Sequence, residues 1–557
     1  MKTIVDGNET PKITLLSREV LWGAGRFGSA TAILVYLALA KLLIHLLTAN
    51  NYGYFGDEFY WLAMAKHLDF GYVDVPPLVA YVGALWRLLF GTSLFAVHFL
   101  PALAGAVMVF FAGLLARELG GGRFAQGFTA LMVLTCPCCL AVNSWFAYDP
   151  FDQLCSVILL YLFVRLIKQE TPRRWIGLGI MAGLGIMTKL TMIFTVGALV
   201  LALLTRAGLE AGAHTHASPG RKSFLVKWPW LAVLIGVLLC MPYLIWQWVH
   251  GWPLITYWHS YAVSPYRPHF EILQFLWYLL MNLNPVLLPV YGLGLSYLLF
   301  HREGKKYRPL GLSFLVLLVF FGYMKAPPRL LVSACFPLLA AGAVWLERLN
   351  TRARDGWVLG WKGFLWFQRA YLGIILIAGF LIAPLVLPVL PISVLEKYLT
   401  VIPKFITEEP ASAFSGNRLP FAFAYRFGWP ELVEKVAEVY HSLPEADRKK
   451  CVIWADSYGH AGAIDLLGKK YGLPDAISNH YSYQFWGPDP SHSGVDPEVV
   501  IKVGGTVMEG SFAEKTVAAF VIGNPYAASW NRYQSIYLCR KPTFSLKEVW
   551  PKLANFY

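Results

Sequence analysis

Four carboxylates lie close together in residues 51–81, NYGYFGDEFYWLAMAKHLDFGYVDVPPLVAY, at Asp57, Glu58, Asp69 and Asp74. Aromatic side chains and a Pro-Pro pair surround them, and long apolar segments lie on both sides. A carboxylate held near an apolar boundary can take a proton from a hydroxyl nucleophile, which is general-base chemistry. What such a base could act on depends on the other charges that the fold brings to it.

The remaining candidate residues also lie at the ends of apolar segments. Asp149 and Asp152 occur in NSWFAYDPFDQL, Lys189 in GIMTKLTM, and Lys325 and Arg329 in YMKAPPRLL. Lysine and arginine can stabilise the negative charge of a phosphate leaving group. Carboxylates and isolated cations at one membrane–water boundary therefore suit a reaction between a water-borne nucleophile and a lipid-borne phosphate.

The elements that must position these residues are apolar helices. Of the 557 residues, 57% are hydrophobic and 14% charged, whereas soluble domains carry about 25% charged residues. We therefore predict a polytopic α-helical membrane protein, and a helix needs about 20 apolar residues to cross the bilayer. A shorter apolar stretch, 77–91, is predicted to be a re-entrant or interfacial helix. The eleven predicted spans are 27–48, 93–116, 123–143, 151–168, 174–188, 190–206, 228–249, 271–300, 309–323, 330–347 and 366–394.

The basic residues between the spans predict the orientation. With a cytoplasmic N-terminal tail at 1–26, the basic clusters fall on the cytoplasmic side at every crossing, as the positive-inside rule requires. The first outer loop, 50–92, and the whole C-terminal region are then outside the cytoplasm. Because topology accounts for the distribution of the net charge of +14, no nucleic acid is predicted as a partner.

The composition changes at about residue 396. The segments CVIWA, VVIKV, AAFVIG and SIYLC read as short strands, and helical stretches at 430–442 and 459–471 alternate with them. We therefore predict a transmembrane domain at 27–395 and an extracytoplasmic α/β domain at 396–557. Pairing of Cys451 with Cys539 in the second domain is left open.

Several classes of protein are disfavoured by what the spans lack. Apart from their ends, the spans are almost free of Asp, Glu, Lys and Arg, whereas ion-coupled transporters place such residues near the midplane. A lipid-glycan flippase or a neutral-solute permease remains the alternative to an enzyme.

The sequence also lacks motifs for bound cofactors, because no nucleotide-binding glycine motif is present. CPCC at 136–139 is interpreted as buried structural cysteine. We predict neither a metal nor any other cofactor.

Six segments occur in this order along the chain: GDE, DVPPLVAY, WFAYDPFDQL, IGLGIMAGLGIMTKLTMIF, WPWLAVLIGVLLCMPYLIWQWVHGWP and FPLLAAGA. Together they resemble the polyprenyl-phosphate-dependent glycosyltransferases of family 39 in the GT-C superfamily, which includes protein O-mannosyltransferases and aminoarabinose transferases. The resemblance covers roughly residues 27–395. It implies a GT-C fold and a location in a bacterial cytoplasmic (inner) membrane. It also implies inverting transfer of a monosaccharide from a polyprenyl-phosphate donor to an extracytoplasmic glycan, lipid or protein.

The resemblance assigns roles to the carboxylates. Asp57 matches the general base, and Asp74, before the Pro-Pro pair, matches a second acidic position that binds substrate. Asp152 matches an acid of the family, and Asp149 beside it is predicted to contact the substrate as well. Glu58 is predicted to bind substrate, although it could instead cap the helix that follows it.

The cations are predicted to bind the donor phosphate. Lys189 is the sole cation between two apolar spans, and its alternative role is to reach the lipid interface. Arg329 has the planar group suited to a bidentate phosphate contact, and Lys325, four residues before it, is predicted to help. Val75 replaces a lysine found before the prolines in some relatives, and a Tyr pair after the basic residue is replaced by Leu330 and Leu331.

Overall fold

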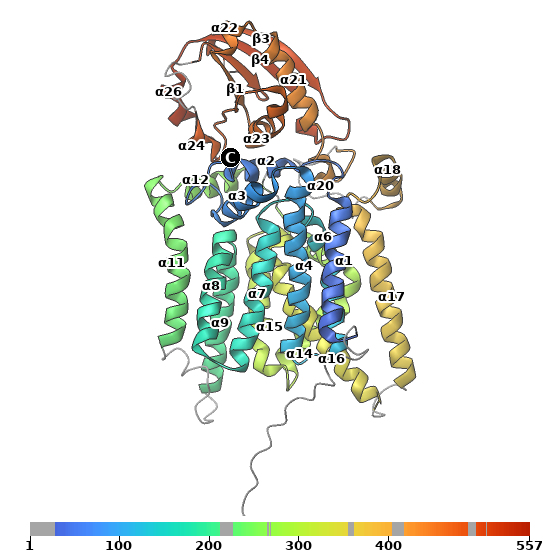
Figure 1. Cartoon of the computed structure of the whole chain (residues 1–557). Coiled ribbons are helices and arrows are strands. Elements are labelled where there is room, and N and C mark those ends of the chain that lie inside the picture. Colours follow the sequence, from blue (N-terminus) through green and yellow to red (C-terminus); the bar gives the residue numbers. More distant parts are fainter. Residues whose placement is uncertain are drawn as a thin grey trace, which may run out of the picture.

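The computed structural model describes residues 28–211, 227–264, 267, 269–354, 361–403, 417–487, 497–507 and 509–556. It consists of a helical bundle with a smaller α/β domain on one end (Figure 1). The predicted cytoplasmic tail at residues 1–26 lies outside the described residues.

Within the described residues, seven helical segments are long and apolar enough to cross a membrane, or eight if one bent pair counts as a span. The chain is therefore an integral, multi-pass membrane protein. Other predicted spans are shorter helices, so the count of eleven stays a prediction. The bundle helices are α1 (Ala30–Thr48), α4 (Leu94–Glu118), α5 (Arg123–Leu134), α6 (Pro137–Val142), α7 (Tyr148–Lys168), α8 (Pro172–Thr188), α9 (Met192–Ala211), α11 (Lys227–Val249), α13 (Ile272–Leu283), α14 (Leu288–Phe300), α15 (Arg308–Tyr323), α16 (Phe336–Arg354) and α17 (Trp361–Val386).

The predicted span at 271–300 is a bent pair of helices rather than one continuous helix. Helix α13 and the segment that contains α14 meet at an angle of 94°. Asn284 at the break has a φ of 70°, and its side chain accepts a hydrogen bond from the Val286 N–H at 3.2 Å. Pro285 follows, and a proline disfavours the helical conformation in the residue before it. The break is therefore encoded by the Asn-Pro pair.

Two polar residues inside α1 stabilise the short helix α6, which follows α5 after a break in the helix. Lys41 is fully buried, and its Nζ donates to the carbonyl oxygen of Cys139 at 2.8 Å. The His45 ring lies 3.1 Å from the carbonyl oxygen of Leu140. Both carbonyls belong to the short helix α6, and unpaired backbone groups are costly in a bilayer. Lys41 lies well inside the predicted span 27–48. The sequence pattern assigned it no role, and the structure shows that it binds a backbone carbonyl of α6.

A layer of short helices separates the bundle from the α/β domain (Figure 1). Its members are α2 (Gly56–Met64), α3 (Leu78–Phe90) and α12 (Pro253–Val263). Helix α3 coincides with the stretch that was predicted to be interfacial or re-entrant. This layer carries the first outer loop and therefore the acidic residues of the predicted site.

The α/β domain contains a four-stranded sheet in the order β1-β2-β4-β3. Strands β1 (Cys451–Ala455) and β2 (Val499–Val503) are parallel. Strand β4 (Tyr533–Pro542) is antiparallel to β2 and to β3 (Phe512–Ile522). All four predicted strands are thus confirmed. Cys451 on β1 and Cys539 on β4 are separated by β2, and both are free thiols.

The domain is joined to the helical layer by a shared hydrophobic core. Phe59 and Tyr60 of α2 belong to the same buried cluster as Trp429 of α21 (Trp429–Ser442) and Ile464 of α23 (Tyr458–Leu467). A Cβ atom added at Gly462 of α23 would lie 2.7 Å from the Phe59 carbonyl oxygen. Helix α23 therefore rests directly on α2, and glycine is what allows this approach.

Candidate active site

Helix α2 begins at the acidic pair of the first outer loop. Carboxylates in a first helical turn interact favourably with the helix dipole. Glu58 is fully buried, and its Oε2 accepts a hydrogen bond from the Phe55 N–H at 2.7 Å. Its Oε1 accepts from the Phe146 N–H at 2.6 Å, and the His98 ring lies 3.1 Å from Oε2. The structure thus gives Glu58 protein partners on both oxygens, in agreement with the capping alternative.

Asp57, the predicted base, is partly exposed. The hydroxyl of Tyr458, from the α/β domain, donates to Asp57 Oδ1 at 2.7 Å. Burial raises the pKa of Asp57, and hydrogen bonds from Tyr458 and Tyr425 together with the charge of Arg329 oppose that rise. The carboxylate is therefore held by hydrogen bonds in a setting that favours proton uptake.

Asp74 lies in the segment between α2 and α3, close enough to Asp57 for the two carboxylates to repel each other. The Tyr60 hydroxyl is 2.9 Å from Asp74 Oδ1 and 2.7 Å from the Ser482 hydroxyl. Burial raises the pKa of Asp74 to about 7, against the effect of the hydrogen bond from Tyr60. Two carboxyls with raised pKa values thus face one region, as is typical of functional sites.

The first turn of α7 brings further charges to the same region. Lys189 caps the C-terminal end of α8, and its Nζ donates to Asp149 Oδ1 at 2.7 Å. The same Nζ lies 4.5 Å from the centre of the Tyr148 ring. Asp152 follows Asp149 on α7 and is partly buried. Helix α7 therefore begins at the acids, and Lys189 pairs with one of them.

The two other predicted cations have different surroundings. Arg329 lies in the short helix η4 (Pro328–Leu331) and is exposed, and its charge reaches the carboxylate of Asp57. Lys325 instead forms an exposed ion pair with Glu271, just before α13. The structure therefore brings Arg329 to the acids, whereas Lys325 has a carboxylate partner elsewhere.

The α/β domain adds a group of aromatic rings that the prediction did not include. The Tyr458 ring stacks on Tyr481 with centroids 5.2 Å apart, and it lies 4.8 Å from the Tyr60 ring. Tyr257 of α12 packs edge-on against Tyr481 at 5.5 Å. The only sequence signal is position: Tyr458 begins a helix just after β1, and ligands in α/β sheets bind at the carboxyl ends of strands.

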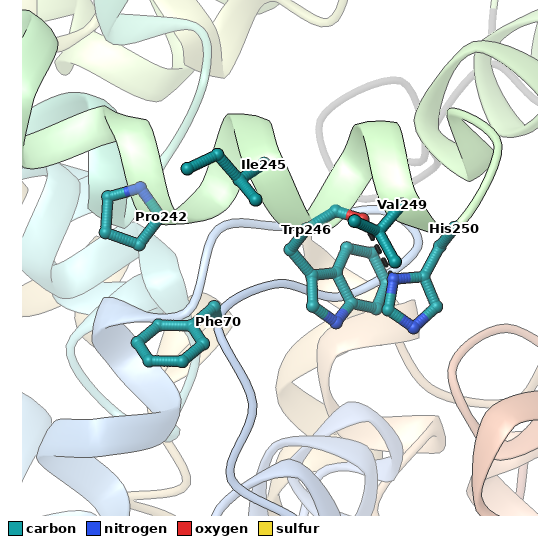
Figure 2. Close-up of a pocket in the computed structure, with 6 residues that line it drawn as sticks. All are labelled: Phe70, Pro242, Ile245, Trp246, Val249 and His250. Atoms are coloured by element: carbon teal, nitrogen blue, oxygen red, sulfur yellow. Dashed lines mark hydrogen bonds between the residues drawn. The ribbon is translucent and has the colours of Figure 1, made fainter.

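An apolar groove of about 410 Å³ lies between Phe70 of the first outer loop and α11 (Figure 2). Figure 2 shows Phe70 of the first outer loop facing side chains of α11. Tyr243 of α11 packs with Met187 and Leu190, which flank Lys189 in sequence. Helix α11, which carries most of the lining residues, therefore also packs beside the segment that contains Lys189. Its lining residues are Phe70, Pro242, Ile245, Trp246, Val249 and His250.

No group of three or more His, Cys, Asp or Glu residues that could hold a metal ion occurs in the described part of the chain. The expectation of no metal or other cofactor stays a prediction.

Comparisons with known proteins agree with this architecture. A family described as dolichyl-phosphate-mannose-protein mannosyltransferase matches residues 74–246. The crystal structure of ArnT from Cupriavidus metallidurans in the apo state covers 91% of this chain and 98% of its own, with a TM-score of 0.56 and 14% identity. The chain has the GT-C fold. The structure of the same ArnT bound to undecaprenyl phosphate aligns with a TM-score of 0.55 and 14% identity, over the same shares of both chains.

A curated relative gives a more limited match. The lipid A galacturonosyltransferase of Rhizobium johnstonii is 23% identical over 232 residues, which are 40% of this chain and 44% of that protein. The chain thus spans less than half of this relative's length in the match. The predicted GT-C fold is confirmed, and the family match includes Asp74, Asp149, Asp152 and Lys189 but begins after Asp57.

Proposed function

We propose that this protein is an inverting glycosyltransferase that moves a monosaccharide from a polyprenyl-phosphate donor to an extracytoplasmic acceptor. The observation that carries this proposal is the meeting of the carboxylates Asp57 and Asp74 with the cations Lys189 and Arg329 at one end of the bundle. The GT-C fold and the relatives that match it support the same reaction class.

Asp57 is the general base in this proposal. The acceptor oxygen attacks the anomeric carbon while its proton passes to the Asp57 carboxylate. The bond from the anomeric carbon to the donor phosphate oxygen breaks, and the phosphate leaves with the electron pair, so the anomeric configuration inverts. Since burial raises the pKa of Asp57, its carboxylate is a stronger base than a solvated one. Asp74 and Asp152 are proposed to bind hydroxyl groups of the sugar and the acceptor.

The donor phosphate is proposed to bind between Arg329 and Lys189. Arg329 offers a planar group for two phosphate oxygens. Lys189 is already held by Asp149 at 2.7 Å, so its ammonium group needs no reorganisation when charge develops on the phosphate. Lys325 could join them only if its ion pair with Glu271 opened, and its phosphate role stays a prediction.

The prenyl chain of the donor is proposed to lie in the apolar groove along α11. The groove is lined by apolar and aromatic side chains, and Ile245 and Val249 are exposed on the bundle surface. Helix α11 also packs beside the segment that contains Lys189, through Tyr243 against Met187 and Leu190, so a chain along this helix is proposed to place its phosphate near Lys189. One of the solved ArnT structures contains undecaprenyl phosphate, which supports a donor lipid of this class.

The acceptor is proposed to approach from the side of the α/β domain. With the basic clusters in the cytoplasm, the N-terminus is inside and this domain lies outside a bacterial cytoplasmic (inner) membrane. The curated relative is a lipid A galacturonosyltransferase, so an envelope lipid or glycan is the acceptor class to test first.

The experiment is turnover of the purified protein with a panel of synthetic polyprenyl-phosphate sugars and acceptor-containing membranes. Release of polyprenyl phosphate from one donor is expected, and Asp57→Asn should abolish release while leaving donor binding intact. No release from any donor would favour the flippase or permease instead. Retention of most turnover in Asp57→Asn would remove Asp57 from the role of base.

A further inference from the structure

We infer that the α/β domain completes the active site, with Tyr458 as a positioning residue that holds the Asp57 carboxylate. This inference rests on the proposed function, because it takes Asp57 to be the general base. The domain is then a part of the catalytic unit rather than a separate binding module.

The contact itself is a short and well-supported hydrogen bond. The Tyr458 hydroxyl donates to Asp57 Oδ1 at 2.7 Å, and Tyr458 is the first residue of α23. Ser457 caps that helix by accepting from the His460 N–H at 3.3 Å. Because Gly462 lies against the Phe59 backbone, α23 is fixed on α2, the helix that carries Asp57. The donor and the acceptor of the bond are thus held by two helices in direct contact.

The Tyr458 ring is held on its sides as well. His480 and Tyr481 both stack on it, with centroids 5.0 and 5.2 Å away. Tyr481 has a φ of 50°, a left-handed conformation that non-glycine residues adopt mainly where the surroundings enforce it. The Tyr481 N–H also donates a hydrogen bond to the Asn555 carbonyl at 2.9 Å. The end of the chain therefore helps to place the rings that hold Tyr458.

The same loop of the domain also reaches the second carboxylate. The Ser482 hydroxyl oxygen accepts from the Val73 N–H at 3.0 Å, directly before Asp74. It also lies 2.7 Å from the Tyr60 hydroxyl, which contacts Asp74. Both carboxyls of the site are therefore connected to the α/β domain, Asp57 directly and Asp74 through Tyr60.

The hydrogen bond from Tyr458 has a measurable electrostatic consequence. It lowers the pKa of Asp57, against the larger effect of burial. Without this hydrogen bond the pKa of Asp57 rises. The carboxylate is then protonated, and cannot act as a base, at pH values where the wild-type carboxylate is still ionised. The groups that face Asp57 from the packed elements are Tyr458 of α23, Tyr425 after α20 (Phe421–Ala424), Arg329 of η4, Asp149 of α7 and Asp74 of the first outer loop.

The test is the pH profile of turnover for Tyr458→Phe, which keeps the stacked ring and removes the hydroxyl. The acid limb should move to higher pH by about one unit, with turnover approaching the wild-type value at alkaline pH. Tyr533→Phe is the matched control, because Tyr533 is a 70% exposed tyrosine of the same domain. Its profile should match that of the wild type.

Each outcome has a distinct meaning. An unshifted profile, or an equal loss of turnover at every pH, would overturn the positioning role while leaving the proposed function in place. Donor binding, measured on the same samples, should be unchanged in Tyr458→Phe, and its loss would also overturn the inference because Tyr458 would then support the whole site. Absence of wild-type turnover with every donor would instead contradict the proposed function itself.

Discussion

The Nζ of Lys189 and the Oδ1 of Asp149 lie 2.7 Å apart, in an ion pair that joins the end of α8 to the first turn of α7. Their side chains are 12% and 18% exposed, so the pair is largely removed from solvent. A buried charge that loses its partner is strongly destabilising, whereas replacement of both partners by apolar residues is often neutral. This asymmetry allows the structural and the phosphate-binding roles of Lys189 to be separated.

Lys189→Met is expected to lower the free energy of unfolding by about 3 kcal/mol, because Asp149 is left buried and unpaired. The double variant Lys189→Met with Asp149→Leu should recover most of that stability and still bind polyprenyl phosphate poorly. Thermal unfolding in detergent and titration with polyprenyl phosphate measure the two quantities. Recovery of lipid binding in the double variant would show that Lys189 serves only as a partner for Asp149.

The sequence predicted those parts of the fold that depend on local pattern. The strands were readable because each is a short apolar run bounded by polar segments, as in CVIWA and VVIKV. The predicted span 151–168 lies within α7, and the helix begins three residues earlier, at Tyr148, where acids and Pro150 in the first turn are typical of a helix N-terminus. The break at Asn284 could have been read from the Asn-Pro pair, but the apolar run around it suggested a continuous span.

The sequence did not predict contacts between distant segments. Tyr458 and Asp57 are 401 positions apart, and no local pattern indicates that their helices touch. Likewise, nothing near Lys325 in sequence indicates its ion pair with Glu271. Glu58 was ambiguous because a first-turn acid can either cap a helix or face a substrate, and only its three protein partners favour the first role.

Asp74 should make stability dependent on pH. Burial raises its pKa in the folded protein to about 7, above the usual value of 3.8. Below the usual value the group is protonated in both states, and as the pH rises toward 7 only the unfolded state loses its proton readily. Asp74 therefore lowers the stability as the pH rises from about 4 to 7. Asp74→Asn should stabilise the protein at pH 8, by about 1–2 kcal/mol after solvent screening, and have little effect at pH 4.

Thermal unfolding of Asp74→Asn and of wild type at these two pH values measures this difference. Asp69→Asn is the matched control, because Asp69 lies in the same loop and its Oδ1 accepts a hydrogen bond from the adjacent Phe70 N–H at 2.7 Å. The two substitutions should differ at pH 8. An equal effect of Asp74→Asn at both pH values would contradict a buried, readily protonated carboxyl.

The groove on α11 predicts a dependence on the length of the donor lipid. Ile245 lines the groove and is 50% exposed, so Ile245→Ser removes apolar contact with a prenyl chain but no group near the phosphate. The KM for a long-chain donor should rise roughly fivefold, since about 1 kcal/mol of apolar contact is lost, while a short-chain analogue should be unaffected. Val237→Ser, on the same helix at 47% exposure and outside the groove, should leave both KM values unchanged. Equal KM changes for both donors in Ile245→Ser would place the prenyl chain elsewhere on the bundle.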